Sequence, residues 1–193
     1  SATGKLLPTG RPVDHLDGAD GLEVSLVDAS NPVVFAKAEA VGITGAESPG
    51  ALDADAALME KLDRIRRAGA VAMGLAERPE DALLSSPKVA LVAPPRPFTA
   101  LDGRKYEPDA FHLSVRLVSM GNFHRAITLT GARCTAVAAR IPGTLLEPFV
   151  PDTGPEAGDV LIGNPSGILP LKADVKHDAD GPKAVSATTF RTQ

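Results

Sequence analysis

Residues 119–131 read SMGNFHRAITLTG, and this stretch decides the fold of the chain. An alternating apolar run at 113–118 leads into it, and its Met-Gly-Asn supplies a turn. The segment 126–139 that follows carries Arg133 as its single charged residue and is rich in Ala, Gly and Cys. A helix that is apolar and small nearly all round is normally enclosed. The pattern predicts a strand, a turn and an enclosed central helix, which Thr128 or Thr130 caps and Pro142-Gly143 ends.

Further strands and one amphipathic helix are predicted around this centre. Apolar spacing predicts a helix over 54–75 with Asp53 as its N-cap, while residues 1–21 and 150–158 are expected to be irregular. Alternation and β-branched runs predict strands at 22–27, 33–35, 89–93, 113–118, 160–163, 168–174 and 183–190. Many short strands with two helices indicate an α+β fold, in which a curled, mostly antiparallel sheet wraps around the central helix.

Composition excludes several classes of protein. With 193 residues, 44% of them hydrophobic and 23% charged, the chain is long enough for a core and is not disordered. A net charge of −4, with its longest basic run at 64–67 on a predicted helix surface, argues against nucleic acid as a partner. No apolar run is long enough to span a bilayer, so no membrane partner is expected. The single cysteine, Cys134, allows no intrachain disulfide and fits a cytoplasmic location.

The predicted start of the central helix is the first candidate site. The first N–H groups of a helix lack intrahelical partners and carry partial positive charge, so a carboxylate can bind there. Thr128 and Thr130 add hydroxyl groups, and Arg125 could clamp a carboxylate with two hydrogen bonds. The alternative is that a Thr merely caps the helix and that Arg125 lies on the surface.

Two side chains near this helix could take part in proton transfer. His124 titrates near neutral pH and is a candidate general acid or base, although a single His at a helix start is more often structural. Cys134 lies inside the apolar helix, where a thiol is usually inert. No pair of histidines has the spacing of metal ligands, so no metal is expected.

Two turns at strand ends are further candidates. Asn31-Pro32 and 164–167 (Asn-Pro-Ser-Gly) can each direct backbone N–H groups and a small polar side chain toward an anion. Taken alone, ordinary turn chemistry explains both equally well.

Several of these segments, in order along nearly the whole chain, resemble one known family, the 2-methylaconitate isomerases and 4-oxalomesaconate tautomerases. The matching pieces are 3–10 (TGKLLPTG), 28–32 (DASNP), 68–74, 119–121 (SMG), 124–126 (HRA), 141–145 (IPGTL) and 164–167 (NPSG). The resemblance implies a diaminopimelate-epimerase-like fold, in which two similar halves hold a substrate in the cleft between them. It also implies that this chain is the C-terminal half, with residues 1–21 as the interdomain connector and 22–193 as the second domain.

The resemblance further implies how the two halves share the work. In the epimerases a catalytic Cys opens the central helix, and here Thr128 takes that place. A Thr hydroxyl is too weak an acid to serve as the base near neutral pH. We therefore expect this half to hold the substrate and the absent first half to supply the base, a Lys in this family. The resemblance also implies that the family's closing C-terminal strand is missing here, so the fragment alone is expected to be inactive.

These inferences give a specific functional prediction. The full-length protein is predicted to be a cofactor-independent isomerase that moves a double bond by a 1,3-proton shift on a small unsaturated di- or tricarboxylic acid. A non-catalytic carboxylate-binding module and an amino-acid epimerase or racemase are the alternatives. The expected partners are the substrate and the N-terminal half, with homodimer formation left open. His124 is the catalytic candidate, and the substrate-binding candidates are Asn31, Met120, Gly121, Arg125, Thr128, Leu129, Thr130, Gly131, Ser166 and Gly167.

Overall fold

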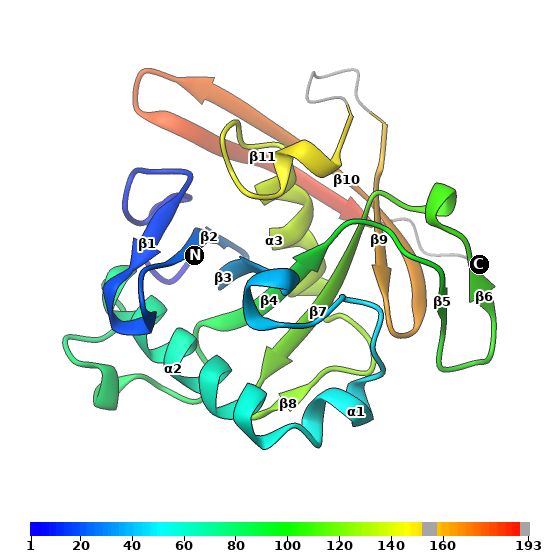
Figure 1. Cartoon of the computed structure of the whole chain (residues 1–193). Helices are drawn as coiled ribbons and strands as arrows, with labels where there is room; N and C mark the ends of the chain where they lie inside the picture. The colour runs from blue at the N-terminus through cyan, green and yellow to red at the C-terminus, as the bar shows by residue number, and fades with distance from the viewer. Residues whose placement is uncertain (152–157, 190–193) are drawn as a thin grey trace.

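The computed structural model describes residues 1–151 and 158–189 and has one large sheet (Figure 1). Its strand order is β1-β2-β3-β4-β7-β9-β10-β11, with β8 paired to β7. β3 runs parallel to β4 and β7 to β9, whereas the other pairs are antiparallel. The strands are β1 Asp14–Leu16, β2 Leu22–Ala29, β3 Asn31–Lys37, β4 Lys88–Ala93, β7 Leu113–Ser119, β8 Asn122–Phe123, β9 Val160–Asn164, β10 Gly167–Asp178 and β11 Gly181–Thr189. The mostly antiparallel α+β architecture is confirmed.

Helices cover this sheet from both sides, and a small hairpin flanks it. The α-helices are α1 Pro49–Asp53, α2 Ala56–Ala72 and α3 Leu129–Ala139. Short 3-10 turns lie at η1 Asp17–Ala19, η2 Ala38–Val41, η3 Pro79–Asp81, η4 Pro108–Ala110 and η5 Glu147–Phe149. The hairpin pairs β5 Phe98–Thr99 with β6 Lys105–Tyr106. In the described part of the chain, none of the helices is long and apolar enough to cross a membrane.

The alternation of side chains along each strand creates two separate cores. On β3, Val33 and Phe35 face α3, whereas Val34 and Ala36 face α2. The core around α3 also takes Val115 and Leu117 from β7. The sheet therefore separates α2 from α3, and a residue's position on a strand determines which helix it can reach.

The predicted central helix is confirmed. α3 is buried from Ala132 to Ala139 except for the half-buried Arg133. It contacts β2 and β3 toward one end of the strand order and β9, β10 and β11 toward the other. The expected curling of the sheet is not confirmed, because the order is an open path in which β1 and β11 do not pair with each other.

Three local predictions differ from the structure. Asp55 caps α2, accepting the N–H of Leu58 at 3.1 Å, so the prediction that Asp53 is the cap was wrong. Asp53 instead ends α1, a short helix that its Pro- and Gly-containing sequence concealed and that Ser48 caps. β1 lies within the stretch expected to be irregular, since three residues are too few to produce a periodic pattern.

The C-terminal predictions hold with shifted bounds. β10 extends four residues beyond the predicted strand at 168–174, and β11 matches the prediction at 183–189. Most of the predicted loop at 150–158 and the last residue of the predicted strand at 183–190 lie outside the described residues.

Gly69 allows α2 to approach the sheet closely. A Cβ atom at Gly69 would lie 2.4 Å from Cγ2 of Val34, which is fully buried. We expect Gly69→Ala to lower the free energy of unfolding by about 1–3 kcal/mol, although the same change in an exposed helix is favourable by about 1 kcal/mol. Urea denaturation of Gly69→Ala, Val34→Ala and the double variant measures this. The double variant should lose less free energy of unfolding than the two single variants lose together. A Gly69→Ala protein that is more stable than the original would contradict the close approach of α2 to the sheet.

Candidate functional site

The N-terminal tip of α3 has free hydrogen-bond donors. Thr128 is the N-cap, and its Oγ1 accepts the N–H of Gly131 at 3.1 Å. The N–H groups of Leu129 and Thr130 have no partner in residues 1–151 and 158–189. Leu129 is 46% exposed and Thr130 is also exposed, so protein atoms do not seal the tip. Two donors and the positive end of the helix dipole are thus available to an anion.

Gly131 lets the cap close tightly. A Cβ atom there would lie 2.8 Å from Cδ2 of Leu117 and 2.9 Å from Oγ1 of Thr128. Any larger residue would therefore displace the capping hydroxyl or the β7 side chain beneath it. This explains on steric grounds why a glycine stands at the third helical position.

The structure brings Asn31 to the helix tip. Ser30, with a φ of 65°, forms the tight turn between β2 and β3, so Asn31 pairs with Ala29. From this position Asn31 Nδ2 donates a hydrogen bond to Thr130 Oγ1 at 3.2 Å. Two candidates 99 residues apart in the sequence thus meet, as the functional prediction requires.

The turn at 164–167 supports the segment that leads into α3. Asn164 is 4% exposed, and its Oδ1 accepts the N–H groups of Ser166 at 3.1 Å and Ile127 at 3.4 Å. Its Nδ2 donates to the carbonyl of Gly167 at 3.1 Å, and Ser166 Oγ donates to the carbonyl of Arg125 at 2.7 Å. Ser166 and Gly167 are therefore neighbours of the α3 entry. Asn164 is the residue that joins them to it, and sequence reasoning did not single it out.

Arg125 is bound to α1. Its Nη1 forms an ion pair with Asp53 Oδ2 at 2.5 Å and donates to the carbonyl of Phe123 at 2.8 Å. Asp53 Oδ1 also accepts the N–H of Phe123 at 2.8 Å. In this arrangement the guanidinium holds the β8 turn against α1. It would have to leave Asp53, or share its remaining N–H groups, to clamp a carboxylate.

His124 is a half-buried imidazole that is neutral at neutral pH. Burial, and then the positive charge of Lys88, lower the pKa of His124 below its ordinary value, so the ring is uncharged at neutral pH. Its Nε2 atom is buried and has no partner in the described part of the chain. The backbone N–H of His124 donates to Leu117 at 2.8 Å, which fixes the residue beside β7. This burial favours a structural role, and the catalytic role stays a prediction.

Met120 and Gly121 lie away from the helix tip. Both have positive φ angles, 56° and 80°, in the turn from β7 to β8. They line a small hollow of about 30 Å³ together with Met59, Leu62 and Arg66 of α2. That hollow is on the α2 face of the sheet, so the structure does not bring these two candidates together with Thr130.

Cys134 cannot act as a nucleophile in this structure. It is fully buried, and its thiol lies 3.5 Å from the carbonyl oxygen of Val27. Burial raises the pKa of Cys134 to about 12, so the thiolate is not formed near neutral pH. The thiol that an amino-acid racemase needs is therefore missing from the α3 tip.

A broad groove of about 650 Å³ lies beside the β2–β3 turn. The N-terminal segment, Ser30 and the β10–β11 hairpin line it. Asp28, 2% exposed, pins the N-terminal segment here, since its Oδ2 accepts Thr3 N–H at 2.7 Å, Thr3 Oγ1 at 2.6 Å and Ser1 Oγ at 2.9 Å. Through Ser30 the groove adjoins Asn31.

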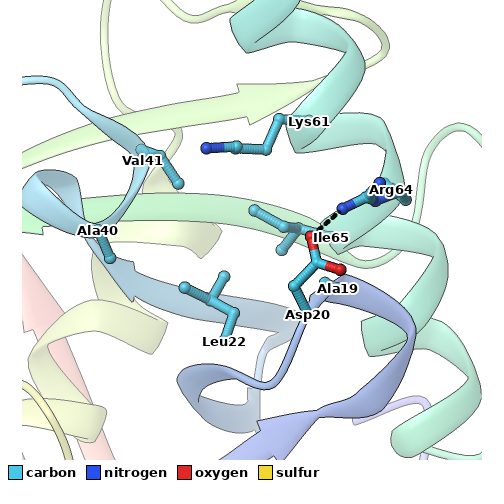
Figure 2. A pocket seen from close by; sticks show the side chains of 8 residues that line it. All are labelled: Ala19, Asp20, Leu22, Ala40, Val41, Lys61, Arg64 and Ile65. Carbon is cyan, nitrogen blue, oxygen red and sulfur yellow. Dashed lines mark hydrogen bonds and ion pairs between the residues drawn. The ribbon is translucent and has the colours of Figure 1, made fainter.

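A second hollow, of about 170 Å³, lies on the α2 face (Figure 2). The Lys61 ammonium extends over it toward Val41, and Arg64 pairs with Asp20 at 2.5 Å. None of the predicted site residues lines it. Within residues 1–151 and 158–189, no group of three or more His, Cys, Asp or Glu side chains is arranged to hold a metal ion.

The solved structure of a methylitaconate-delta-isomerase shares this architecture. It matches with a TM-score of 0.86 and 34% identity, over 98% of this chain and 51% of that one. The PrpF protein family model matches residues 1–193, and the chain belongs to this family.

Named relatives agree with this assignment. A 3-methylitaconate isomerase from Eubacterium barkeri is 38% identical over 100% of this chain and 50% of its own length. A 2-methyl-aconitate isomerase from Shewanella oneidensis is 36% identical over 91% of this chain and 45% of its own. Another relative is named for oxalomesaconate, so the resemblance found in the sequence is confirmed. The chain spans about half the length of the curated relatives it matches.

Proposed function

We propose that this chain is the substrate-binding half of an isomerase that moves a double bond by a 1,3-proton shift on a small unsaturated di- or tricarboxylic acid. The relatives are named as isomerases of such acids, of the methylitaconate, 2-methylaconitate and oxalomesaconate types. We also propose that residues 22–193 are the second of two domains and that 1–21 is the connector. The match to about half of each relative supports only that the chain corresponds to one part of a longer protein. We extend the proposal to a diaminopimelate-epimerase-like arrangement of the two halves.

The observation that carries the proposal is the open tip of α3. The unpaired N–H groups of Leu129 and Thr130 point the same way along the helix axis, and Asn31 lies 3.2 Å from Thr130 Oγ1. Leu129 and Thr130 are exposed at this tip, so we infer that the first half forms the opposite wall of the site. One substrate carboxylate would take the place of water on the two N–H groups.

In the proposed chemistry this half stabilises the negative charge of the intermediate, and it does not have to supply the base. A base removes a proton from carbon, and the resulting dienolate places negative charge on oxygen. Fixed N–H and hydroxyl donors stabilise such charge, which is commonly the largest catalytic term. We assign this task to the N–H groups of Leu129 and Thr130 and to the hydroxyl groups of Thr128 and Thr130. Gly131 keeps the cap closed through its bond to Thr128, and Asn31, Ser166 and Gly167 are proposed as supporting contacts. The base is assigned to the first half.

Three of the other candidates receive weaker assignments. Arg125 is proposed as a substrate contact only in a state in which it shares or leaves Asp53. Met120 and Gly121 are proposed to act by shaping the turn before β8, since they line a hollow on the α2 face.

Ultraviolet absorbance tests the proposal directly. The complete reading frame that contains this chain should convert 2-methylaconitate, methylitaconate or oxalomesaconate, with a change in the absorbance of the conjugated system. The 193-residue chain alone should bind the acid without converting it. Absence of conversion of all three acids by the complete protein would refute the isomerase function, and binding without conversion would then favour the carboxylate-binding module. Deuterium exchange at an amino-acid α-carbon would favour an epimerase instead.

A further inference from the structure

Arg116 is a buried cation on the face of β7 opposite α3. Its neighbours Val115 and Leu117 belong to the core around α3, so the alternation of the strand turns Arg116 to the other side. Arg116 is 2% exposed. Its guanidinium carbon lies 5.8 Å from the centre of the Phe98 ring, a distance typical of a cation–π contact.

The hydrogen bonds of Arg116 use only part of its guanidinium. Nε donates to the carbonyl of Glu47 at 3.0 Å, and Nη1 donates to Ser114 Oγ and the carbonyl of Val115, both at 3.3 Å. Nη2 has no hydrogen-bond partner in the described residues. It is also not one of their fully buried polar atoms that lack a partner, so it keeps some contact with solvent. One edge of the guanidinium, with two N–H groups, is therefore reachable from outside.

The charge of Arg116 has no ion pair within the described chain. Glu47 is the acidic neighbour, but its carboxylate accepts the N–H groups of Thr44 and Gly45, both at 2.8 Å, and the Thr44 hydroxyl at 2.8 Å. Burial lowers the pKa of Arg116 to about 10, and the charge of Glu47 opposes this only partly. The group stays cationic at neutral pH. Buried charges in proteins are normally paired, so this one lacks a counter-ion.

The free edge of Arg116 opens into a cavity of about 330 Å³. Apolar side chains form part of its walls, namely Pro49, Pro97, Phe98, Leu101 and Pro165, and Ala46 and Glu47 also line it. Ser48 and Thr99 add two hydroxyl groups. The Glu47 carboxylate is already bonded to Thr44 and Gly45, so the free edge of Arg116 is the charged group left to bind a ligand. A cavity of this size, with apolar side chains beside that edge, suits a small organic molecule.

We propose that this cavity binds a small organic carboxylate with an apolar body, whose carboxylate accepts the two Nη2–H groups of Arg116. The apolar side chains in the walls, such as Phe98 and Leu101, favour such a ligand over a bare inorganic anion, which would stay better hydrated in water. The site is separate from the tip of α3, because it lies on the other face of the sheet. It does not rest on the proposed isomerase function.

A ligand in this cavity would also contact Pro165, which belongs to the turn at 164–167 that supports the tip of α3. Pro165 lies between Asn164 and Ser166, which bind the backbone at Ile127 and Arg125. The N–H of Leu101 donates to the carbonyl of Pro165 at 2.9 Å. Pro165 therefore connects the wall of the cavity to the turn on which the entry to α3 rests.

Titration of the ¹⁵N-labelled full chain with benzoate tests the proposal. The backbone amide resonances and the arginine side-chain N–H resonances are monitored. Thr99, Leu101 and the Arg116 side chain should shift with one saturable curve. Benzamide, which has the same ring but no charge, should bind at least about tenfold more weakly, as loss of a charge-assisted hydrogen bond requires. Absence of saturable shifts, or equal affinity for benzamide, would overturn the proposal.

Two variants at one exposed position test the proposal without changing a buried residue, so a loss of binding cannot be due to misfolding. Leu101 is 55% exposed at the cavity, so Leu101→Glu and Leu101→Gln should both fold. The new carboxylate of Leu101→Glu should repel benzoate and weaken its binding at least about fivefold relative to Leu101→Gln. Equal binding by the two variants would contradict the assignment. Arg116→Gln, if it folds, should abolish binding, whereas retained affinity would refute the role of the guanidinium.

Discussion

Leu129→Pro should weaken binding of an unsaturated di- or tricarboxylate about 10- to 100-fold, because it removes one N–H group that is proposed to hold a carboxylate. Leu129 is the first residue of α3, the one helical position at which proline is favoured. Thr128 has φ −66° and ψ 151°, a conformation that a following proline accepts. The helix should therefore form normally, and the loss should come from the missing donor alone. Calorimetric titration of the complete protein with 2-methylaconitate measures it.

Leu129→Ala is the matched control. It removes the side chain, which is 46% exposed, but keeps the N–H group, so its affinity should stay within about twofold of the original. The thermal midpoints of both variants should be nearly equal. If Leu129→Pro binds the acid as tightly as Leu129→Ala, the helix tip does not hold the carboxylate, and the proposed site is wrong.

Asn164→Ala should destabilise the protein by about 3 kcal/mol and should also reduce carboxylate binding. The change leaves three backbone groups, at Ile127, Ser166 and Gly167, without their partner at a buried position. Each buried unsatisfied group costs about 1–3 kcal/mol, less where water enters the space. The entry to α3 would lose its anchor, so the helix tip should be displaced as well. Urea denaturation and the same calorimetric titration measure the two effects.

Ser166→Ala provides the comparison for this prediction. Ser166 is exposed and donates one hydrogen bond, to the carbonyl of Arg125, so its loss should cost about 1 kcal/mol or less. Similar stabilities of Asn164→Ala and Ser166→Ala would show that Asn164 is not the anchor of this turn.

The central helix could be predicted from sequence because its signals are local. The small, nearly uncharged segment predicts its burial, and Thr128 and Thr130 were the two candidates for its cap. The structure selects Thr128, whose hydroxyl accepts the N–H of Gly131. The meeting of Asn31 with Thr130 was anticipated in outline, since both were assigned to one site. That assignment came from family resemblance and not from spacing.

The supporting contacts could not be predicted because they depend on tertiary structure. The role of Asn164 follows from the position of Ile127, which lies 37 residues away. Asp53 has the sequence context of a helix cap, but the turn at Phe123 and Arg125 uses its carboxylate instead. The placement of Met120 on the α2 face depends on the parity of β7, which shifts with one residue of register.

The anchoring of the N-terminal segment by Asp28 has a mechanical consequence. Three donors from Ser1 and Thr3 converge on one carboxylate oxygen of β2, so a force on this N-terminal segment would act directly on that strand. Asp28 stands three residues before Asn31, and Asn31 bonds to Thr130. Tension on Ser1 or Thr3 would thus reach the tip of α3 through the short segment 28–31 and the hydrogen bond between Asn31 and Thr130.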